Sequence, residues 1–166
     1  MSSEDQTTSV DGGLVDTLSE AQLGRLRAGF DEAALSNMAT SLVVADFPSA
    51  GALTLAVQAV LYASKRPFEM SSIDRERLLI GLLAAQGLER QLAVHIYWGL
   101  MVGLSPRAVG ETVVLMGVYN GLARQNEAMG VIKKTLAALA EVAGTRRRKP
   151  VPIAEALSHL LAVFPS

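Results

Sequence analysis

The chain has 166 residues, of which 50% are apolar and 5% aromatic, with a formal net charge of −1 and no cysteine. The near-zero charge supplies no overall field to attract nucleic acid, and the lack of cysteine excludes disulfides, thiolate metal ligands and cysteine nucleophiles. Residues 1–9 carry no signal-peptide pattern, and every apolar run is far shorter than the roughly 20 residues of a membrane helix. We therefore expect a single cytoplasmic domain with neither a nucleic-acid nor a membrane partner.

The first part of the chain predicts a tail followed by helices. Residues 1–13 are polar, which is typical of a disordered tail. The residues 19–22, Ser-Glu-Ala-Gln, match a capping box and predict a helix to about residue 30. Further helices are expected over 31–46 and 50–64. They are separated at Pro48, because a proline pushes the residue before it out of the helical conformation.

The second part predicts a series of helices bounded by capping residues and glycines. They are expected over 73–86, ended by Gly87; over 88–102, with Gly103 after it; over 106–120, opened by Ser105-Pro106; from Gly121 to Val142, stopped by Gly144; and over 153–163, after a linker at 145–152. No stretch alternates apolar and polar residues as an exposed strand would. The fold class predicted is all-α, with a helical domain over 14–144 and a basic linker and terminal helix over 145–166.

The helix expected over 88–102 is apolar on nearly every side, so it should be buried in the core or against another subunit. Gln91 and His95 stand one turn apart on it and share a face. A buried polar group without a partner costs roughly 1–3 kcal/mol, so this pair needs partners inside the protein. Two interpretations follow: a satisfied core histidine, which is the commoner case, or a binding pocket.

Several segments, taken in order, resemble the carboxymuconolactone decarboxylase family, which also includes the alkylhydroperoxidase D proteins. They are Arg75-Glu76-Arg77-Leu78-Leu79, Gln91-Leu92-Ala93-Val94-His95, Gly103-Leu104-Ser105, Glu111 and Tyr119-Asn120-Gly121. The resemblance covers roughly residues 50–140. It implies an alkylhydroperoxidase-like helical bundle that assembles as a homotrimer or homohexamer with pockets near subunit contacts.

The two branches of this family differ in chemistry. The peroxidase branch needs a Cys-x-x-Cys pair before the histidine, which a chain without cysteine cannot supply. The decarboxylase branch has the pattern Glu-Leu-x-x-His, whose histidine maps onto His95 and whose glutamate is replaced by Gln91. Ala123 stands where the family's Tyr-x-Gly-x-Pro element ends in proline.

The resemblance implies a cofactor-free lyase acting on a small carboxylated lactone or related acid. Imidazole titrates near pH 6.5, so His95 suits a proton donor or carboxylate binder. Gln91 cannot ionise, and we expect it to orient the substrate carbonyl or the imidazole. The alternative is an oligomeric binding or scaffold protein of the same fold that has lost catalysis.

Other polar and aromatic residues have a structural interpretation beside the functional one. Trp98 and Tyr119 are expected to pack, with a lesser possibility that they line a substrate pocket. Arg75 and Glu76 are expected to form a structural ion pair or helix-start contacts, and Glu111 suits the first turns of its helix.

The remaining features carry no functional assignment. Gly99-x-x-x-Gly103 predicts a close helix crossing, and residues 146–149 a solvated basic linker. No role is assigned to His159. The spacing of the histidines and the lack of a glycine-rich phosphate loop predict neither a metal nor a nucleotide cofactor.

Overall fold

The computed structural model describes residues 17–35, 37, 70–146 and 149–164. The helices are α1 (Glu20–Ala28), α4 (Ser72–Gln86), α5 (Glu89–Val102), α6 (Pro106–Asn120), α7 (Leu122–Thr145) and α8 (Ile153–Val163). The described residues contain no strand, which confirms the predicted all-α class. The expected tail at 1–13, the helix at 50–64 and most of the helix at 31–46 lie outside the described residues.

Helices α1, α4 and α6 begin at the predicted capping residues, and α4 ends at the predicted glycine. Ser19 forms the capping box with Gln22, while Ser71 and Ser105 accept hydrogen bonds from backbone N–H groups in the first turns of α4 and α6. Gly87 ends α4 in a left-handed conformation, with φ 71°. A residue with a side chain would be strained in this conformation. Glycine therefore marks the end of this helix because its backbone can adopt a positive φ.

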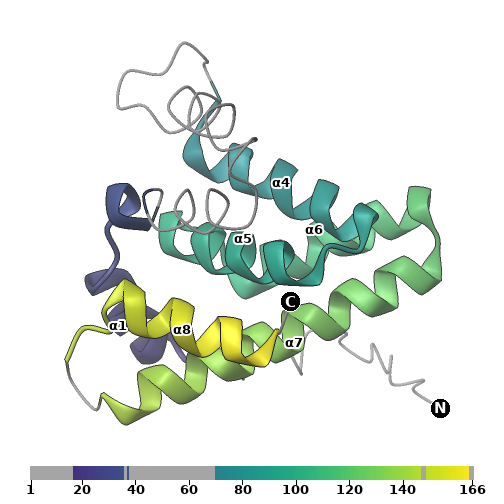
Figure 1. Cartoon of the computed structure of the whole chain (residues 1–166). Helices are drawn as coiled ribbons and strands as arrows, with labels where there is room; N and C mark the ends of the chain where they lie inside the picture. The colour runs from purple at the N-terminus through teal and green to yellow at the C-terminus, as the bar shows by residue number, and fades with distance from the viewer. Residues whose placement is uncertain (1–16, 36, 38–69, 147–148, 165–166) are drawn as a thin grey trace, which may run out of the picture.

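The apolar helix α5 lies at the centre of the fold. It packs against α1, α4, α6, α7 and α8, and Figure 1 shows it between α4 on one side and the α7–α8 pair on the other. Its residues Leu92, Ile96 and Leu100 are buried. A helix that is covered on all sides matches the all-round apolar sequence from which its burial was predicted.

Close packing of α4 on α5 depends on Gly99. A Cβ at this position would lie 2.8 Å from Leu104 Cδ1 and 3.2 Å from Ile80 Cδ1, closer than van der Waals contact allows. The glycine therefore leaves room for the side chains of Ile80 on α4 and of Leu104, which agrees with the close crossing that Gly99-x-x-x-Gly103 predicts.

Helix α1 caps the C-terminal ends of two other helices with its side chains. Gln22 Nε2 donates to the carbonyl of Ala140 at 2.9 Å, and Arg25 Nε donates to that of Ala143 at 3.1 Å. Arg27 Nε donates to the carbonyl of Leu100, near the end of α5, at 2.9 Å. Ala143 and Leu100 lie in the last turns of α7 and α5, where backbone carbonyls have no partner within the helix, so the two arginine contacts stabilise these helix ends.

The predicted stop of the last core helix at Gly144 is wrong. Helix α7 continues through Gly144 to Thr145, whose hydroxyl donates to the carbonyl of Val142 at 2.8 Å. Because Arg25 reaches the carbonyl of Ala143 from α1, the helix end is satisfied without a glycine cap.

The basic run that follows α7 is partly paired. Arg146 donates from Nε to Glu155 Oε1 of α8 at 3.1 Å, and its second contact is between Nη2 and Oε2. The guanidinium lowers the pKa of the Glu155 carboxyl below its usual range. The first residue of this run therefore links α7 to α8; Arg147 and Arg148 lie outside the described residues.

None of the described helices combines the length and the apolar character needed to cross a bilayer.

Tyr97 of α5 is fully buried, and within the described segments its hydroxyl has no hydrogen-bond partner. Its ring packs edge-on against Phe30, with centroids 6.2 Å apart. Burial raises the pKa of Tyr97 above its ordinary value of 10.0. The hydroxyl thus costs free energy of desolvation and returns no hydrogen bond.

We therefore expect Tyr97→Phe to leave the free energy of unfolding at pH 7 unchanged or to raise it by about 1 kcal/mol. Because the folded-state pKa lies above the unfolded one, the wild type should lose stability as pH rises past 10.0, and the variant should lose less. Urea unfolding at neutral and alkaline pH measures both effects. Comparison of the two pH values within each protein separates the ionisation effect from any other effect of the substitution. A loss above 1 kcal/mol in Tyr97→Phe at pH 7 would contradict the interpretation.

Candidate functional site

A buried carboxylate lies at the centre of a polar cluster between α4 and α5. Glu76 has no exposed surface, although it stands in the second turn of α4. The same face of α4 carries Ile80 and Ala84, one and two turns later, and both are buried. The helical repeat therefore places Glu76 in the core, where a charge requires partners.

Arg75 is the first partner of this carboxylate. Its Nε donates to Glu76 Oε1 at 2.9 Å, and its Nη2 donates to Glu32 Oε1 at 2.8 Å. The guanidinium lies 5.8 Å from the ring centroid of Trp98, within the range of a cation–π contact. Arg75 thus bridges two carboxylates and joins α4 to the helical turn at residues 32–35.

His95 of α5 is the second partner. Its Nδ1 lies 2.8 Å from Glu76 Oε2, and its ring is nearly parallel to that of Trp98, with centroids 5.9 Å apart. Its side chain remains 20% exposed, in contrast to the sealed glutamate. A carboxylate accepts hydrogen bonds and does not donate them, so Nδ1 carries the proton and Nε2 is the nitrogen left for another partner.

The chemistry open to this cluster is proton transfer at Nε2. Glu76 holds the imidazole by one nitrogen, Trp98 covers one face of the ring, and Arg75 holds the carboxylate from the other side. Such a support fixes the tautomer and the direction of the imidazole. His95 can therefore give or take a proton, or bind an anion, at the edge of the core.

The predicted site residues are only partly brought together. Gln91 is exposed one turn before His95, and the imidazole, which Gln91 was one candidate to orient, is held at Nδ1 by Glu76. Trp98 is buried against the imidazole, as packing predicts. The packing expected of Tyr119 is wrong: it is the most exposed large apolar side chain in the described part of the chain, because it lies on the outer face of α6.

Sequence reasoning did not assign Glu76 to the site. The structural ion pair expected of Arg75 and Glu76 is present, but the same carboxylate also holds His95. Its spacing from Ile80 and Ala84 was the available signal, since a glutamate in register with buried apolar positions must have partners.

Two other groups named from the sequence form surface pairs. Glu111 pairs with Arg107 at 2.8 Å, within α6. His159 Nε2 lies 3.2 Å from Glu141 Oε2, which joins α8 to α7.

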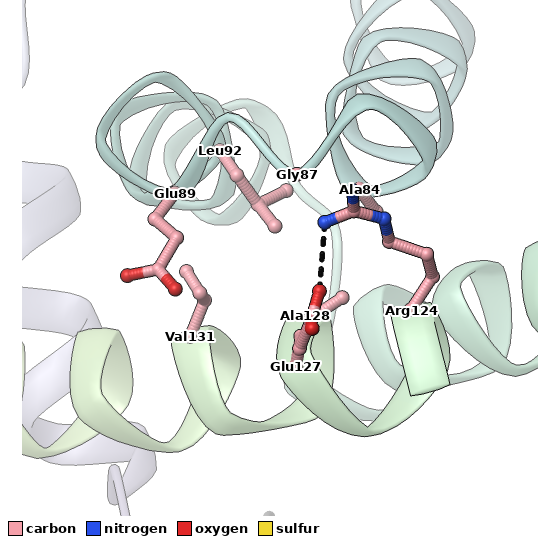
Figure 2. Close-up of a pocket in the computed structure, with 8 residues that line it drawn as sticks. All are labelled: Ala84, Gly87, Glu89, Leu92, Arg124, Glu127, Ala128 and Val131. Atoms are coloured by element: carbon pink, nitrogen blue, oxygen red, sulfur yellow. Dashed lines mark hydrogen bonds and ion pairs between the residues drawn. The ribbon is translucent and has the colours of Figure 1, made fainter. Parts of the chain in front are cut away.

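A cavity of about 220 Å³ lies elsewhere, where the end of α4 and the start of α5 meet α7. Figure 2 shows its lining residues: Ala84, Gly87, Glu89, Leu92, Arg124, Glu127, Ala128 and Val131. Arg124 Nη1 and Glu127 Oε2 are 2.8 Å apart, so these charges neutralise each other. His95 does not line this cavity. No group of three or more potential metal-ligating side chains occurs among the residues with described positions.

Comparison of the chain with protein-family models, curated proteins and solved structures finds no match. The likeness to the carboxymuconolactone decarboxylase family therefore remains a prediction from sequence. The function has to be inferred from the polar cluster itself.

Removal of the buried charge should destabilise the protein. Glu76→Gln leaves Arg75 and His95 without their shared carboxylate, and we expect the free energy of unfolding to fall by about 3 kcal/mol. Urea unfolding measures the change. Glu111→Gln removes the exposed pair with Arg107 and should cost less than about 0.5 kcal/mol. Equal effects of the two substitutions would show that the buried cluster has no special energetic role.

The contact between His95 and Glu76 also predicts which nitrogen of the neutral imidazole carries the proton. In its neutral form, the Nδ1 proton should face Glu76 and Nε2 should be the unprotonated nitrogen. Long-range ¹H–¹⁵N NMR spectra distinguish the two tautomers, and His95→Asn assigns the signals. An Nε2-protonated neutral ring would contradict the geometry, because Nδ1 would then face the carboxylate without a proton.

Proposed function

We propose that Glu76 and His95 form the acid–base site of a cofactor-free lyase of the carboxymuconolactone decarboxylase type. Its substrate would be a small carboxylated lactone or a related acid. The protein would act in the cytoplasm as a homotrimer or homohexamer. The observation that supports the proposal is the 2.8 Å contact between a fully buried carboxylate and an imidazole that is still 20% exposed. Acid–base catalysis requires such a group, positioned from inside and accessible from outside.

In the proposed reaction, the bond between the substrate carbon and its carboxylate breaks and carbon dioxide leaves. The electron pair is delocalised into the lactone ring, and the carbon then takes a proton from Nε2 of protonated His95. The imidazole becomes the neutral tautomer with its proton on Nδ1, the form that Glu76 stabilises. A proton from water restores the starting state.

The other residues have supporting roles in this proposal. Arg75 is a positioning residue, because it fixes the Glu76 carboxylate through Oε1 and leaves Oε2 to the imidazole. Gln91 is exposed one turn before His95, where its amide could hold a substrate carbonyl or carboxylate. Trp98 limits the movement of the imidazole by covering one face of it.

The second candidate is an oligomeric binding or scaffold protein without catalysis. The observation that favours it is the bridge from Glu32 through Arg75 to Glu76, which ties α4 to residues 32–35 and stabilises the fold whether or not turnover occurs. The two candidates differ in whether the exposed nitrogen of His95 takes part in a reaction.

Substitution of His95 tests the proposal. With carboxymuconolactone and a panel of small lactone carboxylates, we expect the wild type to release carbon dioxide and His95→Asn to lower kcat/KM by 10²- to 10⁴-fold. Glu76→Gln should lower kcat more than it raises KM, because it removes the carboxylate that positions the imidazole for proton transfer. The matched control is His159→Asn, at the other histidine, which pairs with Glu141 on the surface and should retain full activity. Turnover unchanged in His95→Asn, or no turnover of any member of the panel, would favour the scaffold.

A further inference from the structure

Helices α4 and α6 present apolar side chains on their outer surfaces. Leu78 and Leu82 lie one turn apart on α4, and Leu115, Val118 and Tyr119 lie within little more than one turn of α6. Each is more than half exposed, from 51% at Leu82 to 84% at Tyr119. We call these five residues the α4–α6 face.

The two stripes adjoin because α4 and α6 pack side by side (Figure 1). A Cβ at Gly81 would lie 3.7 Å from Thr112 Cγ2, which marks the line of contact between the helices. Leu78 and Leu82 flank Gly81 on α4, and Leu115 follows Thr112 by three residues on α6. The exposed leucines therefore border a common surface that spans both helices.

The size of this face matches that of an interface core. At roughly 100 Å² for a fully exposed aliphatic side chain and 200 Å² for a tyrosine, the exposed fractions amount to about 400 Å². A patch of this size is comparable to the largest that a monomeric protein typically exposes, and such patches often have a function. A stable interface covers about 800 Å² on each partner and is roughly 55–65% apolar, so this face supplies most of the apolar share.

The charges around the face favour a partner of the same kind. Toward the N-terminus, Asp74 and Arg77 form a pair on α4, and Arg107 and Glu111 form one on α6. Each rim carries both signs, so a rotated copy can place acids against bases. A helix face that binds membranes is instead rich in lysine and arginine, and the net charge of −1 matches neither a membrane surface nor a highly charged partner.

We propose that a second copy of this chain docks on the α4–α6 face, with Tyr119 as its central anchor. Tyrosine is enriched among the residues that contribute most to binding, because it combines a large apolar ring with a hydroxyl. This inference rests on the homo-oligomer proposed above and identifies its two-fold contact surface, which a homohexamer has between its two trimers. It also gives Tyr119 a role in assembly in place of the substrate pocket.

Sedimentation velocity over about 1–100 µM tests the assembly. We expect the wild type to sediment as an oligomer, and Leu115→Glu and Tyr119→Glu to raise the dissociation midpoint at least 100-fold. Both positions are exposed, so circular dichroism should show unchanged helix content. Val163→Glu, at an exposed apolar residue of α8, is the control and should sediment as the wild type does.

Cross-linking tests the same surface without a disruptive substitution. The chain has no cysteine, so Val118→Cys and Val163→Cys each carry a single thiol. A short bis-maleimide should link copies of Val118→Cys and leave Val163→Cys unlinked.

The outcomes separate the surface from the oligomer on which it rests. A wild-type monomer at every concentration would overturn both, as would binding of that monomer to phosphatidylcholine–phosphatidylglycerol vesicles. An oligomer that persists in Leu115→Glu and Tyr119→Glu, or equal cross-linking of the two cysteine variants, would overturn the α4–α6 face alone. None of these outcomes depends on whether His95 is catalytically active.

Discussion

The carboxylate of Glu76 is the constraint on which the polar part of this structure depends. It is completely buried, and each of its oxygens has one partner: Arg75 at 2.9 Å and His95 at 2.8 Å. A charge in the core is tolerated only when its partners are in place, so this contact fixes α4, α5 and the turn at residues 32–35 relative to one another. The imidazole is consequently a directed group at the edge of the core, and the function proposed for it uses the nitrogen that Glu76 leaves open.

Backbone packing and side-chain chemistry are coupled at this contact. Gly99 lets α4 approach α5, and a Cβ there would also lie only 3.6 Å from Cβ of Glu76. Further along, α1 stabilises the C-terminal ends of α5 and α7 through Gln22, Arg25 and Arg27. Helix α5 is thus held near its C-terminal end by α1 and along its middle by α4, and both contacts fix the position of His95.

The two proposals concern different surfaces of α4, which contributes to the polar cluster with α5 and to the α4–α6 face with α6. Helix α4 directs Glu76 inward, toward the proposed acid–base site, and Leu78 and Leu82 outward, toward the proposed second copy. A substitution on the outer surface is therefore expected to change assembly without contacting the buried cluster. The cavity beside Arg124 belongs to neither surface, because it is lined by no residue of the cluster and by none of the α4–α6 face.

The sequence by itself determined the helices and most of their ends, because Ser19, Ser71, Ser105 and Gly87 act within one turn of the chain. It also singled out His95 as the polar residue of an apolar helix. Only the tertiary structure decided the partner of this histidine, since Glu76 and His95 lie on different helices and Gln91 has the right spacing but faces outward. It likewise decided that α7 passes Gly144, through side chains of α1 more than 100 residues away in sequence. Local signals act through neighbouring backbone atoms, whereas these contacts exist only after distant helices have packed.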